Sequence, residues 1–301
     1  MKLVTMTRYF STQFGMEKAV DLLSEAGFDG LDFTAYHTSE FYTDVHSKAY
    51  YEEIRKRAEA RGVPFEQAHA PYHGSYHGDD PRTEQQILEI VCSMKNASYL
   101  GIKNVVVHPI QHYRYRLPGM PERLFEENIV FYRRLLSYAE EYGIRVCVEN
   151  MCQGDMDILN VPSVCARPAE MIRYFDEINH PLFGCCLDIG HATLVREDTA
   201  AFIRALGKKR LTCLHVHDVD AAHDRHLPPY FGGAVNWDRV LSALAEIDYE
   251  GSFTYEADYF FGQKPPALAT AAARLIAAIG HTLTRRFEEQ VAKKDLPQSR
   301  A

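Results

Sequence analysis

The chain has 301 residues, of which 46% are hydrophobic and 25% charged, and its formal net charge at pH 7 is −8. This composition is typical of a globular protein, and the acidic balance argues against a nucleic-acid partner. The seven cysteines are an odd number, and several lie in apolar segments, so we expect reduced thiols and no disulfides.

The chain begins directly with a strand-like segment, without a charged and then apolar leader, and we expect no apolar stretch of membrane-spanning length. These features predict a cytoplasmic protein without a membrane partner. They leave open whether the chain forms a homo-oligomer.

Strand-like and helix-like segments alternate along the whole chain, which is typical of βα units. Short apolar runs bounded by turn residues predict strands that are buried on both faces, as in a parallel sheet. The expected strands are residues 2–6, 30–34, 64–69, 104–109, 145–150, 183–189, 211–218 and 252–257. The expected helices are residues 15–26, 47–61, 81–100, 121–142, 168–177, 199–206 and 237–247, and a long one from 266.

Glycines follow several of these helices, as helix C-caps do before the short return to a strand, at Gly27, Gly62, Gly101 and Gly143. Eight βα units in about 290 residues match the dimensions of a (β/α)8 TIM barrel. A doubly wound sheet would be expected to carry a Gly-rich phosphate turn after an early strand, and the sequence has none. We therefore expect one barrel domain over residues 1–301, with a charged C-terminal tail at 286–301.

Five of the expected strands end in a possible metal ligand or general base, at His108, Glu149, Asp188, His215 and Glu256. The carboxyl ends of parallel barrel strands lie on one face, where barrel enzymes carry their chemistry. These side chains are therefore expected to converge.

Three carboxylates and one imidazole, from Glu149, Asp188, His215 and Glu256, form a mixed oxygen and nitrogen set that suits Mn, Co, Mg or Zn. One such residue alone would more often cap a helix or pair with Lys or Arg. Four at equivalent positions of alternating βα units favour a divalent metal site.

Further candidates surround this set. His191 follows Asp188 by three residues, and we expect Gly190 to permit a tight turn that brings His191 over the site. We expect one tightly held ion, with any second ion bound weakly near His191, Asp224 and His226. The other candidates for an additional metal or for substrate are His69, His108 and His217.

Several motifs together resemble the xylose isomerase-like barrel superfamily, in particular its sugar isomerase and epimerase branch. The resemblance covers nearly the full length. The motifs are Val148-Glu149-Asn150, Leu187-Asp188-Ile189-Gly190-His191-Ala192, Leu214-His215-Val216-His217-Asp218, His226-Leu227-Pro228 leading to Val235-Asn236-Trp237, and Tyr249-Glu250-Gly251 running into Glu256.

The resemblance implies a metal on Glu149, Asp188, His215 and Glu256, with His191 near the substrate. It also implies that Glu149 and Glu256 flank a sugar and act as acid and base on its opposite faces. The implied activity is that of a divalent-metal-dependent isomerase or epimerase, which moves a proton next to the carbonyl of a keto-sugar or related polyol through an enediolate.

Other members of the same superfamily offer alternatives. Endonuclease IV-type repair enzymes use three zinc ions, and a barrel lyase or dehydratase or an accessory subunit is also consistent with the fold. The ligand pattern of the zinc nucleases resembles His69, His108, Glu149, Asp188, His191, His215, Asp224, His226 and Glu256. The acidic balance and the few clustered Lys and Arg residues argue against the nuclease.

The chain also departs from the epimerases that it resembles. Those enzymes carry an arginine shortly after the histidine of the seventh expected strand (residues 211–218), and this chain has Ala221 at that position. The turn at residues 230–233 is also one residue longer than in those enzymes. Both differences lie where substrate would be held, so the sugar specificity of the relatives does not transfer.

Overall fold

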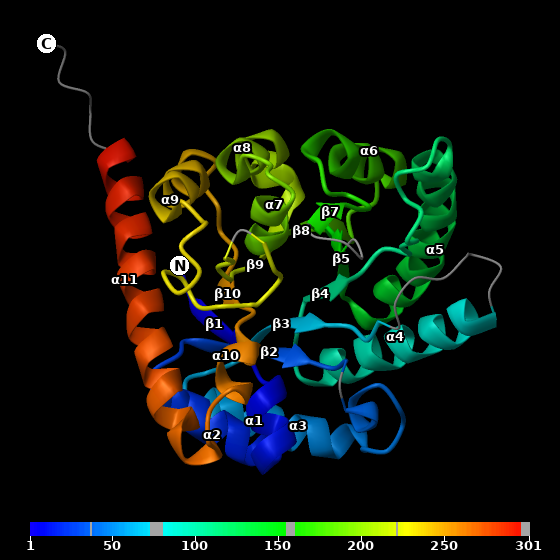
Figure 1. The fold of residues 1–301 in the computed structure, drawn as a ribbon. Coiled ribbons are helices and arrows are strands. Elements are labelled where there is room, and N and C mark those ends of the chain that lie inside the picture. Colours follow the sequence, from blue (N-terminus) through cyan, green and yellow to red (C-terminus); the bar gives the residue numbers. More distant parts are fainter. Residues whose placement is uncertain (37, 73–80, 155–159, 221, 296–301) are drawn as a thin grey trace, which may run out of the picture.

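The computed structural model describes residues 1–36, 38–72, 81–154, 160–220 and 222–295. An 8-stranded parallel sheet has the strand order β10-β1-β2-β3-β4-β5-β8-β9, and a bridge between Val216 and Tyr255 joins its two ends. The barrel predicted from the sequence is therefore confirmed (Figure 1). Its strands are β1 (Leu3–Met6), β2 (Gly30–Thr34), β3 (Phe65–His69), β4 (Asn104–Val107), β5 (Arg145–Glu149), β8 (Phe183–Asp188), β9 (Leu211–His215) and β10 (Phe253–Tyr255).

The main helices form a ring outside the strands, as Figure 1 shows. Each of them corresponds to one of the helical segments expected from the sequence, with small differences at the ends. They are α2 (Met16–Ala26), α3 (Lys48–Ala60), α4 (Pro81–Tyr99), α5 (Met120–Tyr142), α6 (Pro168–Ile178), α8 (Thr199–Arg210), α9 (Trp237–Glu246) and α11 (Ala269–Asp295).

Short elements that the sequence analysis did not predict lie at the carboxyl ends of the strands. Helices α1 (Arg8–Phe14), α7 (Ile189–Leu194) and α10 (Asp258–Gly262) begin almost where β1, β8 and β10 end. A small antiparallel sheet pairs β6 (Cys152–Gly154) with β7 (Asn160–Pro162), and a 3-10 turn occurs at Ser39–Phe41. A second 3-10 turn, Pro266–Leu268, forms the start of the long helical segment expected from residue 266. Elements this short contain too few residues to show a helical or strand period in the sequence.

The barrel interior holds a small apolar layer that positions the site. Val106, Cys147, Cys186 and Cys213 form a buried cluster on β4, β5, β8 and β9. Side chains two residues apart on a strand share a face. The residues two positions further along these strands are His108, Glu149, Asp188 and His215, so the polar candidates stand directly above this layer. All seven cysteines are unpaired, as expected.

Helix α11 continues to Asp295, so residues 286–295 of the segment expected as a charged tail are helical, and 296–301 lie outside the described residues. Phe287 belongs to the core and Val291 packs against it. Lys294 pairs with Asp248 at 2.6 Å. These contacts explain why the helix continues into the segment that its charge predicted to be a tail.

By length and composition alone, the helical stretch Pro266–Lys294 would pass as a membrane span, contrary to the expectation that no stretch reaches that length. Its apolar residues Ala273, Ile276 and Leu283 are buried in the core, and α11 lies against α9, α2 and β1. The same apolar side chains therefore pack α11 onto the barrel.

Candidate metal centre and active site

Four of the strand-end side chains converge at the mouth of the barrel. Glu149, Asp188, His215 and Glu256 each offer one ligand atom, and these atoms all lie within 4.8 Å of one another. His215 Nδ1 is 3.2 Å from Glu149 Oε1 and 3.0 Å from Glu256 Oε2, so the two glutamates flank one imidazole nitrogen. None of the four residues is more than 5% exposed.

Buried polar atoms without partners are concentrated in this cluster. Both carboxylate oxygens of Glu149, both ring nitrogens of His215 and Oε2 of Glu256 are buried and make no hydrogen bond with a described residue. Buried polar atoms normally have a partner. A divalent cation coordinated by three carboxylates and one imidazole would satisfy these atoms, so the donor set fits such an ion.

The cluster strongly favours positive charge. Burial opposes ionisation of Glu149, yet the His215 and His108 imidazoles hold the pKa of its carboxyl well below the usual range. Burial likewise opposes ionisation of Glu256, but His215 and His226 lower the pKa of that carboxyl. Burial also disfavours protonation of His226, and nevertheless Glu256 and Asp224 raise its pKa to about 9. A metal ion would take over the charge balance that protons on the histidines otherwise provide.

A second group shares Glu149 with the first. His69, His108 and Glu149 offer ligand atoms within 4.8 Å of one another. The Nε2 atoms of the two histidines are 3.1 Å apart, and His108 Nε2 is 3.3 Å from Glu149 Oε2. Glu149 therefore belongs to both groups, and its carboxylate could serve as a ligand for a cation in either.

A third group, His191, His217, Asp224 and His226, lies on the other side of Asp188. An Asp224 carboxylate oxygen is 3.3 Å from His191 Nε2, and the other is 3.2 Å from His226 Nε2. His217 Nε2 is 3.0 Å from both carboxylate oxygens of Asp188, and its ring stacks on that of His226. The structure thus brings every residue proposed from the sequence into one continuous polar region.

Three of these histidines are oriented in the same way by the backbone. His69 Nδ1 donates to Ala70 O at 2.7 Å, His191 Nδ1 to Asn150 O at 2.9 Å and His226 Nδ1 to Glu256 O at 3.2 Å. A carbonyl only accepts hydrogen bonds, so Nδ1 carries the proton and Nε2 is directed toward the neighbouring ligand groups. This arrangement is common for metal-binding histidines.

The loop that carries Asp224 and His226 is fixed to the barrel by one buried carboxylate. Asp218 accepts backbone N–H groups from both ends of this loop, at distances of 2.9 to 3.2 Å. The donors are Val219, Tyr230, Gly233, Ala234 and Val235. Ala221 lies outside the described residues.

Gly190 has a different role from the expected tight turn. It lies within α7, where Asp188 caps the helix by accepting the His191 N–H at 2.6 Å. A Cβ at position 190 would lie 2.0 Å from Cε1 of the His217 ring. The missing side chain therefore makes room for His217, and the helix, not a turn, places His191 over the site.

Sequence reasoning missed residues beside these groups. Asn150 Nδ2 donates to Asp188 O at 2.9 Å, and Asn150 Oδ1 accepts the Asp188 N–H at 2.7 Å, which fixes the position of Asp188. The Arg8 guanidinium lies over the rings of Tyr36 and Tyr259, at 5.4 and 5.9 Å. The sequence gives only one indication of a role for Arg8, which is that it closely follows strand β1. Asp258 follows strand β10 in the same way.

Asp258 is almost fully buried two residues after Glu256. Burial raises the pKa of its carboxyl to about 7, although the positive charge of Arg8 opposes this shift. No hydrogen bond from a described residue reaches either of its carboxylate oxygens.

Comparison with known proteins gives a consistent picture of the fold. A family model described as xylose isomerase-like TIM barrel matches residues 20–279. L-ribulose 3-epimerase of Methylomonas sp. is 27% identical over 143 residues, which are 47% of this chain and 46% of that protein. The crystal structure of a D-tagatose 3-epimerase-like protein has a TM-score of 0.76 at 22% identity, covering 98% of this chain and 100% of that one. The crystal structure of the IolI protein with a bound zinc atom has a TM-score of 0.71 at 17% identity, covering 97% of this chain and 99% of that one.

The close approach at Gly190 leads to a prediction. Gly190→Ala should lower the free energy of unfolding by about 1–3 kcal/mol, because the His217 ring must move. It should also weaken Mn²⁺ binding by about 10- to 100-fold, because His217 would lose its contact with Asp188, one of the four candidate metal ligands. Denaturant unfolding and calorimetric titration measure the two effects.

The matched control is Gly262→Ala, since Gly262 also lies in a short helix and a Cβ there would have no neighbour within 4 Å. Alanine normally favours a helix over glycine, so this control should be neutral or stabilising. If both variants had the same free energy of unfolding and the same Mn²⁺ affinity, the close approach of His217 to Gly190 would not be important for stability or metal binding.

Proposed function

The chain belongs to the xylose isomerase-like TIM barrel family, and on that premise we propose that it is a divalent-metal-dependent isomerase or epimerase acting on a keto-sugar or a related polyol. Mn, Co, Mg or Zn would be held by Glu149, Asp188, His215 and Glu256. The epimerases among the similar proteins support a sugar as the substrate class.

The observation that carries this proposal is the placement of two buried carboxylates around one imidazole. Glu149 and Glu256 approach His215 Nδ1 at 3.2 and 3.0 Å and come from different strand ends. Inverting a carbon next to a carbonyl requires one group that removes a proton and another that returns one from the opposite face. Two glutamates on either side of a common centre can perform these two steps.

The surroundings of the two glutamates set their protonation before reaction. The neighbouring imidazoles lower the pKa of both carboxyls, so both are ionised near neutral pH. One can accept the substrate proton, and the other has to take up a proton from solvent or a neighbouring imidazolium before it returns one to the opposite face. His191 would orient the sugar from above, because its ring lies at the edge of the cluster, with Nδ1 3.5 Å from Glu149 Oε1. The bound cation would supply positive charge next to the sugar oxygens as negative charge develops on them.

A zinc-dependent repair nuclease is the second candidate, and a specific observation favours it. His69 and His108 on one side, and His191, Asp224 and His226 on the other, extend the primary cluster into groups that could hold further ions. Two observations argue against the nuclease. The buried polar atoms without hydrogen-bond partners are concentrated in the cluster of Glu149, Asp188, His215 and Glu256. Asp224, by contrast, already pairs with both His191 and His226, so that group does not need a further ion to satisfy it. The net charge of −8 also disfavours a DNA backbone.

We predict that Glu149→Gln and Glu256→Gln each lower epimer formation by about a hundredfold or more, because an amide cannot accept the substrate proton. The test incubates Mn²⁺-loaded protein with D-fructose, D-tagatose or D-allulose in deuterated water and follows deuterium incorporation and product by NMR. Each variant should still fold, since the glutamates stand above the packed barrel interior.

The control for this pair is Glu250→Gln, since Glu250 is exposed and pairs with Lys208 on the surface. It should retain the rates of the unaltered protein. Full epimer formation by either site variant would move the proton chemistry to other groups, with the histidines next to be tested.

The number of tightly bound ions separates the two candidate functions. We predict one tightly held ion per chain after exhaustive dialysis, with weaker binding near His191, Asp224 and His226. Elemental analysis measures this number, and a duplex with one abasic site tests cleavage in parallel. Three zinc ions per chain together with cleavage of that duplex would overturn the sugar proposal.

A further inference from the structure

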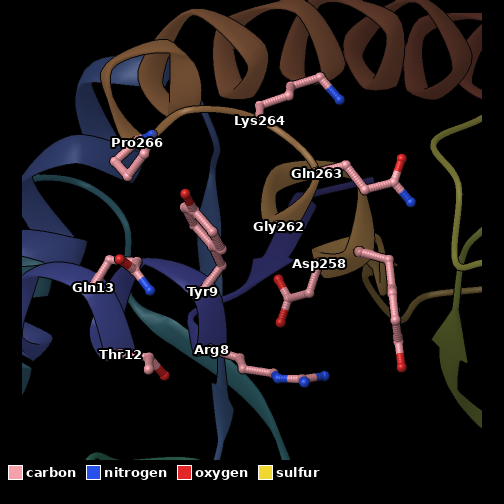
Figure 2. Close-up of a pocket in the computed structure, with 10 residues that line it drawn as sticks. Arg8, Tyr9, Thr12, Gln13, Asp258, Gly262, Gln263, Lys264 and Pro266 are labelled. Carbon is pink, nitrogen blue, oxygen red and sulfur yellow. The ribbon is translucent and has the colours of Figure 1, made fainter.

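A cavity of about 540 Å³ lies between α1 and the α10 segment, beside the metal-binding groups. That volume is within the usual range for small-molecule sites. Its described lining residues include no member of those groups, so the cavity is additional to the space above the metal centre. In Figure 2, Arg8 lies below Asp258, Tyr9 lies to the left of Asp258 and Gln263 lies above it.

Two aromatic residues connect the cavity to the metal-binding groups. The Arg8 guanidinium lies over Tyr36, whose ring is 4.6 Å from that of His69. It also lies over Tyr259, whose ring is 5.8 Å from that of His226. One tyrosine ring therefore separates the Arg8 guanidinium from each of these two histidines.

Arg8 and Asp258 both lack polar partners. The carboxylate oxygens of Asp258 are buried and without a hydrogen bond from the described residues. Among the same residues, no hydrogen bond or salt bridge reaches the Arg8 guanidinium, which lies over the two rings and acts on Asp258 through its charge. Lys264, by contrast, is engaged, because its ammonium donates to Phe260 O at 2.6 Å. Leaving the buried Asp258 carboxylate without a partner costs free energy, which suggests that a ligand supplies one, and the partly exposed Arg8 guanidinium can bind the same ligand.

The charges of this pair restrict the chemistry of that ligand. An anion would satisfy Arg8 but would lie beside Asp258 and near Glu256, where like charges repel. A cation would satisfy Asp258 and repel Arg8. A hydroxyl group both donates and accepts, so it can donate to the carboxylate and accept from the guanidinium at once.

We propose that Arg8 and Asp258 bind the hydroxyl groups of a second, uncharged polyol unit of the substrate, so that the enzyme acts on a glycoside or disaccharide and not on a single free sugar. This inference rests on the proposed sugar function. Tyr9 and Tyr259 line the same cavity and offer ring faces to the second unit.

The test measures affinity and does not depend on turnover. Mn²⁺-loaded protein is titrated calorimetrically with D-fructose, with D-fructose 6-phosphate, and with three disaccharides that contain a ketose, namely turanose, isomaltulose and lactulose. At least one disaccharide should bind tenfold or more tightly than D-fructose, and the phosphate should show no such advantage. Arg8→Met and Asp258→Asn should each bring the ratio of disaccharide to D-fructose affinity close to one.

The matched controls are Arg274→Met and Asp238→Asn, since both residues are exposed and lie outside the cavity lining. Both control variants should keep the ratio of disaccharide to D-fructose affinity that the unaltered protein shows. Preference for the phosphate, no preference for any disaccharide, or an unchanged ratio in Arg8→Met and Asp258→Asn would each overturn the inference. Deuterium exchange into a ketose, which tests the proposed function, can succeed or fail independently of these affinities.

Discussion

Negative charge concentrated at the carboxyl ends of parallel strands is the constraint on which this site depends. Glu149, Asp188 and Glu256 are nearly or completely removed from water, and His215 alone cannot neutralise three carboxylates. Burying such charges without compensation would cost several kcal/mol for each ion. The neighbouring imidazoles lower the pKa of the two glutamates, and the carboxylates in turn raise the pKa of His226. A divalent cation is the natural compensation, and we propose the same cation as the charge that stabilises a deprotonated sugar.

The barrel supplies the rigidity that such a site requires. The layer of Val106, Cys147, Cys186 and Cys213 fills the interior and leaves the polar residues above it at one level. Asn150 fixes Asp188, and Asp218 fixes the loop that carries Asp224 and His226, so hydrogen bonds to the backbone hold these candidate ligands in place. Residues that never touch substrate are therefore expected to affect metal binding.

The sequence predicted the fold, and it indicated which strand-end side chains lie close together, because both depend on strong local patterns. Apolar runs that end in Glu149, Asp188 or His215 indicate buried parallel strands and their common face at the same time. Gly190 was misread, since its need for space comes from His217, which is distant in sequence and adjacent only in the folded chain. Arg8 and Asp258 were missed for a related reason: the absence of a partner for a charge is visible only once the surrounding side chains are placed. Helices α1, α7 and α10 are too short to show a period, and the end of α11 depends on tertiary contacts of Phe287 and Lys294.

The central claim is that Glu149, Asp188, His215 and Glu256 hold one divalent cation in common. A crystal structure of the protein grown with Mn²⁺, with anomalous diffraction recorded to locate manganese, tests this claim most directly. The account predicts that the strongest anomalous peak lies about 2.0–2.4 Å from a carboxylate oxygen of each acidic residue and from a His215 nitrogen. A strongest peak among His191, Asp224 and His226, or no peak within reach of the two glutamates, would contradict it.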